Sequence, residues 1–85
     1  MEAVDSDSII LSGHARERAR QMNVPIPEVV KTVHDPEQTY PQTKYGPRRR
    51  MHQRGRLAVP AKVYDDKVIV VTVLWNTRET FERSE

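Results

Sequence analysis

The sequence contains no cysteine, which excludes a disulfide-stabilised scaffold and a zinc site built on thiolates. It has no apolar run approaching the roughly 20 residues that cross a bilayer, so no contact with a membrane is expected. Its first eight residues, MEAVDSDS, are acidic and lack the basic and apolar regions of a secretory signal. These absences together predict a cytoplasmic protein.

Glycine and aromatic residues are scarce. The three glycines are not clustered, so the chain has no glycine-rich loop for binding phosphate. The three histidines are scattered and no acidic residue stands at ligand spacing from them, so we expect no metal site and no cofactor. Aromatic residues make up only 6% of the chain, which makes a structural adaptor built on Tyr40, Tyr45 and Trp75 the weakest functional interpretation.

Positive charge is concentrated in the middle of the chain, although the formal net charge is only +2. Thirteen of the fourteen Lys and Arg residues, but only six of the twelve Asp and Glu residues, lie between Ser12 and Arg78. A basic folded region attracts polyanions, nucleic acid above all. The same charge also serves solubility, and composition alone does not separate the two explanations.

Helical patterns are confined to the first part of the chain. The apolar segment Ile9 to Leu11 leads to Ser12, which is suited to cap a helix over about 13–22 with one apolar stripe. A second helix follows the prolines of NVPIPE and has apolar residues at i, i+3, i+4 and i+7. Asp35-Pro36 ends it, because the residue before a proline avoids the α region.

Strand patterns follow. The segments 38–41 and 48–53 are read as short strands, and Leu57 to Val63 alternate as in a half-buried strand. Pro60 removes a hydrogen-bond donor from this strand and therefore predicts an edge or a bulge. Asp65-Asp66 is expected to form a tight hairpin turn. The segment KVIVVTVLW that follows is apolar on both faces and is expected to be central.

The predicted fold is α+β, with two N-terminal helices packed on one face of a three- to four-stranded antiparallel sheet. This single domain is expected over residues 9–76. An acidic, disordered tail is expected over 1–8, and a C-terminal tail over 77–85.

His14 and Arg18 form the first candidate site. They are four residues apart and therefore lie on the same side of the first helix. A histidine moves a proton near neutral pH and an arginine binds a phosphate, so the pair suits phosphodiester cleavage. By spacing alone, a solvated helix end is the more common explanation.

The segment KYGPRRRMHQRGR is the second candidate. Alternation over 48–53 puts Arg48, Arg50 and His52 on one cationic face. A charged edge strand is the alternative, but the arginine density exceeds what edge protection needs, so polyanion binding is favoured. The residues assigned to nucleic-acid binding are Lys44, Tyr45, Arg48, Arg49, His52, Arg54 and Arg56.

Thr72 interrupts the apolar row of the last strand. Its hydroxyl can point into a cleft and orient a phosphate oxygen. A β-branched strand residue with a satisfied hydroxyl is the more common case by spacing alone.

The stretches SGHARERARQMNVPIPEVVKTVHDPEQTYP and DDKVIVVTVLW resemble the DUF4258 family, over about residues 9–76. The resemblance implies similarity to metal-independent RNases and toxins of the barnase-, colicin- and RelE-like kind, in a toxin–antitoxin, phage or mobile-element setting. It also implies a helix pair on a four-stranded antiparallel sheet, with an RNA cleft on the sheet. The matching positions are His14, Arg18, the basic strand around Arg48 and Arg50, and Thr72.

The resulting hypothesis is a toxin-like endoribonuclease that cleaves RNA through a 2′,3′-cyclic phosphate without a metal. His14 would act as general acid or base, Arg18 and Arg50 would neutralise the phosphorane, and Thr72 would orient an oxygen. The alternative is a non-catalytic phage or mobile-element protein that binds nucleic acid or a host protein through a basic sheet. RNA is the expected partner, an antitoxin or host protein is left open, and the oligomeric state is not readable.

Overall fold

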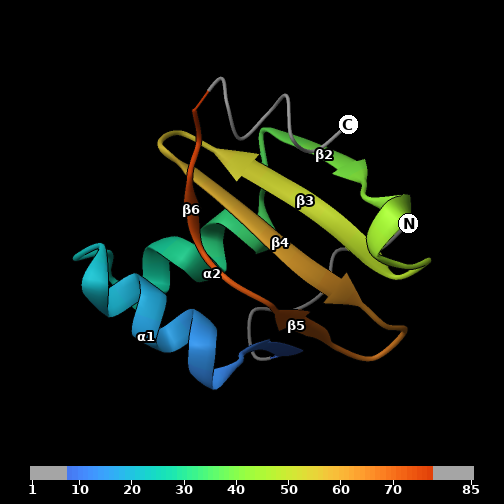
Figure 1. Ribbon diagram of the computed structural model, residues 1–85, viewed down its shortest axis with the longest axis horizontal. Helices are drawn as coiled ribbons and strands as arrows, with labels where there is room; N and C mark the ends of the chain where they lie inside the picture. Colours follow the sequence, from blue (N-terminus) through green and yellow to red (C-terminus); the bar gives the residue numbers. More distant parts are fainter. Residues whose placement is uncertain (1–7, 78–85) are drawn as a thin grey trace.

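The computed structural model of the protein describes residues 8–77 (Figure 1). The elements, in chain order, are β1 (Ile9–Leu11), α1 (Gly13–Gln21), α2 (Ile26–His34), β2 (Gln38–Pro41), the 3-10 helix η2 (Thr43–Tyr45), β3 (Arg49–Arg54), β4 (Leu57–Val63), β5 (Val68–Val70) and β6 (Leu74–Trp75). The predicted α+β class is confirmed. The tails expected over 1–8 and 77–85 lie outside the described residues, apart from Ser8 and Thr77.

The predicted antiparallel sheet of three or four strands is wrong, because the sheet has six strands and is mixed. The strand order is β1-β5-β4-β3-β2, and β6 pairs with β4 next to β5. All pairs are antiparallel except β1 and β5, which run parallel with Ile10 opposite Ile69. Three apolar residues cannot reveal a parallel partner that lies so far away in the sequence, so the direction of β1 was not readable.

The arrangement of the helices also differs from the predicted one. A strand, β1, precedes them, and only α2 packs across β3 and β4 (Figure 1). The main contacts of helix α1 are with α2 and β1. The reason is the size of the buried faces, since α1 buries only Ala15 and Ala19, whereas α2 buries Val29, Thr32 and Val33.

Ser12 caps α1 as predicted and also anchors the helix to the sheet. Its Oγ accepts a hydrogen bond from the Ala15 N–H at 3.1 Å. The same hydroxyl donates to the carbonyl oxygen of Val71 at 3.1 Å, and the Ser12 N–H donates to that of Val70. The first turn of α1 is therefore fixed beside the end of β5.

The segment expected to be the central strand is interrupted opposite Pro60. The register pairs Ala61 with Val70 and Ala58 with Leu74, so the β5–β6 side has one residue more than β4. The extra residue forms a bulge, as Pro60 predicts, because proline has no N–H for the ladder there. The central strand is β4, and β5 is second from the edge.

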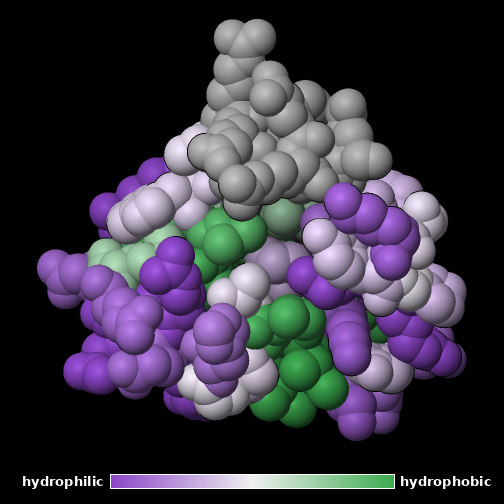
Figure 2. Space-filling view, in the orientation of Figure 1, coloured by the Kyte–Doolittle hydropathy of each residue, from purple (hydrophilic) through white to green (hydrophobic). Residues whose placement is uncertain are grey.

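The hydrophobic core lies between α2 and one face of the sheet. On β4, Leu57, Val59 and Ala61 point to this face and are fully buried together with Val29 and Val70. We call the opposite side, on which β4 places Ala58, Pro60 and Lys62, the far face. Figures 1 and 2 show the molecule from this side.

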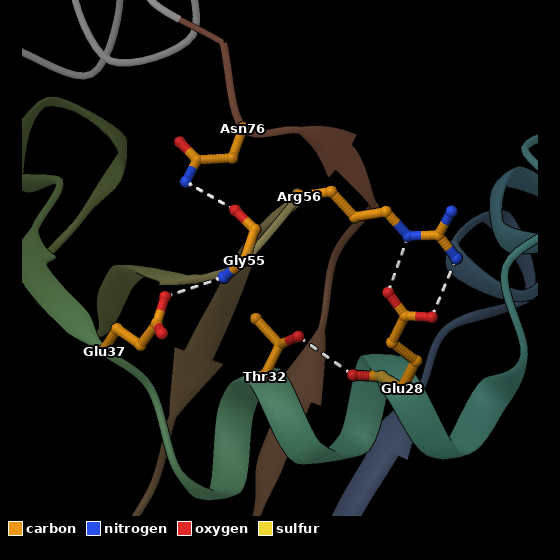
Figure 3. A network of polar contacts seen from close by, with 6 residues as sticks. All are labelled: Glu28, Thr32, Glu37, Gly55, Arg56 and Asn76. Carbon is orange, nitrogen blue, oxygen red and sulfur yellow. Dashed lines mark hydrogen bonds and ion pairs between the residues drawn. The ribbon is translucent and has the colours of Figure 1, made fainter.

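A polar network ties the β3–β4 turn to α2 and to the end of β6 (Figure 3). Arg56 donates two hydrogen bonds of 2.8 Å to the carboxylate of Glu28. The Gly55 N–H donates to Glu37 Oε1 at 2.8 Å, and Asn76 Nδ2 donates to the Gly55 carbonyl at 3.1 Å. The β3–β4 turn is therefore bonded to α2, to the segment that follows α2, and to the residue that follows β6.

Candidate nucleic-acid interface

Strand β3 carries the basic segment, and its register with β4 decides where each arginine points. Arg50 lies opposite Ala61 and His52 opposite Val59, so both belong to the face that α2 covers. Arg49 lies opposite Lys62 and belongs to the far face. The predicted alternation is present for Arg50 and His52, but their side is the core side. Arg48 was predicted on the same face, whereas it precedes β3 and lines a pocket together with Arg49, because alternation does not extend beyond the strand.

His52 is buried, with 6% of its surface exposed. Burial lowers the pKa of its imidazole, and the charge of Arg50 lowers it further, against the opposing effect of a bond to the Val59 carbonyl. The ring is therefore neutral, and Nδ1 carries the proton donated to the Val59 oxygen 3.2 Å away. In this position the ring does not reach a base from solvent.

The lowered pKa of His52 predicts that acid destabilises the fold. In the unfolded chain the histidine has an ordinary pKa of about 6.5 and becomes protonated as pH falls from 7 towards 5, whereas in the folded protein its lowered pKa keeps it neutral over more of this range. Because the unfolded state then binds more protons, the free energy of unfolding decreases. We expect His52→Gln to flatten this dependence in urea unfolding measured at pH 7, 6 and 5. His14→Gln, at an exposed position, serves as the control. A slope in His52→Gln as steep as in the parent would contradict the assignment.

Three of the predicted nucleic-acid-binding or catalytic arginines make contacts within the protein. Arg54 donates to the Asp35 carbonyl at the end of α2, at 2.9 Å. Arg56 pairs with Glu28, and Arg50 Nε donates to Thr39 Oγ1 at 3.3 Å. Their first role is therefore to join α2 and β2 to the central strands.

The remaining basic residues meet two tyrosines at the other end of β3. Here a shallow pocket of about 300 Å³ opens between the η2 loop and the end of β4. We call it the Tyr45–Tyr64 pocket, and its lining residues are Tyr45, Gly46, Pro47, Arg48, Arg49, Lys62 and Tyr64.

Each tyrosine of the Tyr45–Tyr64 pocket makes a cation–π contact with one arginine. The Cζ atom of Arg49 lies 4.6 Å from the centroid of the Tyr45 ring, and that of Arg48 lies 4.7 Å from the Tyr64 ring. Lys44 and Lys67 lie over the same two rings at 5.2 Å and 5.6 Å. A guanidinium that stacks through its face keeps its N–H edge for other partners, which suits bidentate binding of a phosphate.

The electrostatics of the pocket favour an anion. Arg48, Arg49 and Lys62 line it, and no carboxylate does. Within residues 8–77 none of these three cations forms an ion pair. The Nε atom of Arg49 is in addition buried and has no hydrogen-bond partner. The pocket therefore holds more positive charge than the neighbouring protein groups neutralise.

The first candidate pair lies elsewhere in the molecule. His14 is exposed and Arg18 partly buried on α1, which is adjacent to β1. Strands β5 and β4 separate β1 from β3, so three spacings of about 4.8 Å, about 14 Å in all, lie between them. The structure thus does not bring His14 and Arg18 to the basic residues of β3. It does place Thr72, in the β5–β6 bulge, near the first turn of α1, because Ser12 bonds to the neighbouring Val71.

A comparison with protein families matches residues 11–75 to the model described as "Domain of unknown function (DUF4258)". The chain belongs to the DUF4258 family. No curated protein and no solved structure matches it. In this DUF4258 chain, the match begins at the end of β1 and extends to the last residue of β6.

The sequence of the DUF4258 domain led to Tyr45, Arg48 and Arg49 but not to Lys62 and Tyr64. Lys62 lies near the end of a segment that was read only as a half-buried strand, and Tyr64 follows that strand directly. Their position depends on the pairing of Lys62 with Arg49 and on the Val63 N–H, which donates to the Arg48 carbonyl at 2.8 Å. The sequence did contain one indication of their role, since Lys62 and Tyr64 come shortly before the turn at Asp65-Asp66.

Two further properties of the described part of the DUF4258 domain bear on its chemistry. Residues 8–77 contain no group of three or more His, Asp or Glu side chains placed to hold a metal ion. Neither of the helices in this part has the length and apolar composition needed to cross a bilayer.

Proposed function

We propose that this DUF4258 domain binds single-stranded RNA, and that the Tyr45–Tyr64 pocket is the site of binding. The observation that carries the proposal is the pair of arginines, Arg48 and Arg49, each stacked on a tyrosine in a pocket lined by no carboxylate. These contacts restrict the movement of both arginine side chains before a ligand arrives. Less conformational entropy is then lost when they bind a phosphate.

Tyrosines favour a single strand over a duplex. Tyr45 is 51% exposed, so the ring and the Arg49 guanidinium over it lie at the surface, where an unpaired base can contact them. Bases in a duplex are already stacked on their neighbours and do not need such a surface. A relationship to barnase-, colicin- and RelE-like toxins, in a phage or mobile-element setting, is part of the proposal and agrees with an RNA ligand.

Titration of a labelled single-stranded RNA with the purified protein in EDTA, followed by fluorescence anisotropy, tests the proposal. We expect saturable binding that weakens with salt. The slope of log K against log salt should be about 2 in magnitude if the three lining cations contact phosphates, since each contact releases about 0.7 counterion equivalents on a single strand. Absence of binding at low salt would end the proposal.

Cleavage of RNA is a second candidate function, and one observation favours it. His14 is exposed at the start of α1, Arg18 follows one turn later, and the bulge that carries Thr72 lies beside that turn. The 2′-oxygen would attack the adjacent phosphorus and the bond from phosphorus to the 5′-oxygen would break, giving a cyclic phosphate and a free 5′-hydroxyl. His14 would accept the proton of the 2′-hydroxyl, and a proton would be donated to the leaving 5′-oxygen. Arg50 does not belong to this group, since it lies on β3.

We expect His14→Ala to abolish cleavage of total RNA in EDTA if the domain is a ribonuclease, because the proton transfer loses its only histidine on α1. General acid–base catalysis contributes about 100- to 10,000-fold to a rate, and a loss of that size is measurable by gel. His34→Ala, at an exposed position on α2, is the matched control. Equal cleavage by parent and His14→Ala would remove the catalytic assignment and leave RNA binding as the function.

A further inference from the structure

We infer that the Tyr45–Tyr64 pocket recognises the terminal phosphomonoester of an RNA strand and not the phosphodiesters along it. This inference rests on the proposed RNA binding and specifies which group of the RNA the pocket binds. It follows from how the positive charge is distributed over the far face of the sheet.

Within residues 8–77, the basic residues of β3 and β4 on the far face are gathered at the Tyr45–Tyr64 pocket. Arg49 and Lys62 face each other across β3 and β4, and Arg48 lies directly before them. The next far-face positions on β3 are Met51 and Gln53, which are neutral and buried. A strand of RNA bound by several phosphates needs a row of cations along its path.

Strand β4 continues the same pattern away from the pocket. Beyond Lys62, its far-face positions are Pro60 and Ala58, which are neutral and buried. Ile69, which pairs with Lys62, and Leu74, which pairs with Ala58, are apolar as well. Figure 2 shows hydrophobic side chains on this side of the molecule, interrupted by paler and hydrophilic ones. Among residues 8–77, an RNA strand that crosses this surface would therefore meet no positive side chain at these positions.

The other arginines of β3 do not extend the site. Arg50 and Arg54 point to the side of α2, where Thr39 and Asp35 bind them. The basic sequence RRRMHQR therefore divides between two faces, and only its first two arginines reach the pocket. Because the arginines are divided in this way, the basic segment forms a small anion site at the pocket and not a continuous cationic surface.

The number of charges matches a terminal phosphate. A phosphomonoester carries about −1.5 to −2 at neutral pH and has three terminal oxygens, whereas an internal phosphodiester carries a single negative charge. Arg48, Arg49 and Lys62 bring three positive charges to a pocket of about 300 Å³. Two guanidinium forks and one ammonium can occupy all three oxygens, with the adjoining nucleotide next to Tyr45 or Tyr64.

The test compares one RNA sequence with a 5′-phosphate, with a 3′-phosphate, and with hydroxyls at both ends. We expect one phosphorylated form to bind at least about tenfold more tightly than the dihydroxyl form. Arg48→Ala and Lys62→Ala replace exposed residues and should each reduce this preference. Arg54→Ala, on the opposite side of the sheet, is the control and should retain it.

The outcomes separate this inference from the proposed function. Equal affinity for the three RNAs, weakened by Arg48→Ala, would overturn recognition of the end and retain RNA binding. No affinity for any RNA would overturn both. Competition by phosphorylated DNA of the same sequence, by 5′-AMP or by inorganic phosphate, at the same concentration as the phosphorylated RNA, would overturn RNA as the source of the phosphate.

Discussion

Arg49→Ala is expected to weaken binding of single-stranded RNA by about ten- to hundredfold, whereas Arg50→Ala should leave it nearly unchanged. A hydrogen bond to a charged group contributes about 1.5–3 kcal/mol, which corresponds to this range of affinity. Arg49 stacks on Tyr45 at the pocket, while Arg50 points to the α2 side and binds Thr39. The two variants thus remove the same charge from adjacent positions in the chain.

Affinities measured by anisotropy in one buffer decide the comparison, with circular dichroism to show that both variants fold. Since net charge changes equally, a non-specific effect of charge would weaken both variants alike. Equal losses would therefore contradict a focal site. If only Arg50→Ala lost affinity for RNA, the binding surface would lie on the side of the sheet that α2 covers.

Leu57→Ala is expected to lower the free energy of unfolding by about 2–5 kcal/mol, because it leaves a cavity in the core. Leu57 is fully buried between the sheet and the helices. Small domains have about 5–15 kcal/mol in total, so the variant would lose a large share of its stability. Urea unfolding at constant pH measures the change.

Leu74→Ala is the matched control for the core. Leu74 also belongs to a strand paired with β4, but it is only partly buried, on the far face. Its truncation removes fewer contacts and opens no enclosed cavity, so we expect a clearly smaller loss of stability. A loss as large as that of Leu57→Ala would show that the far face holds a second core.

Local structure was predictable from the sequence, because it depends on neighbouring residues. Helix α1 follows its Ser12 cap, and α2 ends at Asp35 before Pro36 as the pattern indicates. The hairpin at Asp65-Asp66 closes with the Tyr64 N–H donating to the Lys67 carbonyl at 2.8 Å. Pro60 indicated the bulge, because a missing donor is a property of one residue.

The candidate site was predictable only in part. The density of arginine over 48–56 pointed to an anion, and Arg48, Arg49 and Tyr45 do line the pocket. Alternation correctly separated Arg49 from Arg50. It did not show which side α2 would cover, because both sides of β3 contain polar residues.

Residue order along the chain was enough to predict the α+β class, the two helices, the strands of the central hairpins and a basic middle section without cysteine. Only the folded chain shows that β1 runs parallel to β5, that His52 is buried, and that Lys62 and Tyr64 join Arg48 and Arg49. The difference lies in the sequence separation of the interacting residues. Helices, caps and turns are set by residues a few positions apart, whereas strand pairing and burial depend on segments brought together from distant parts of the chain.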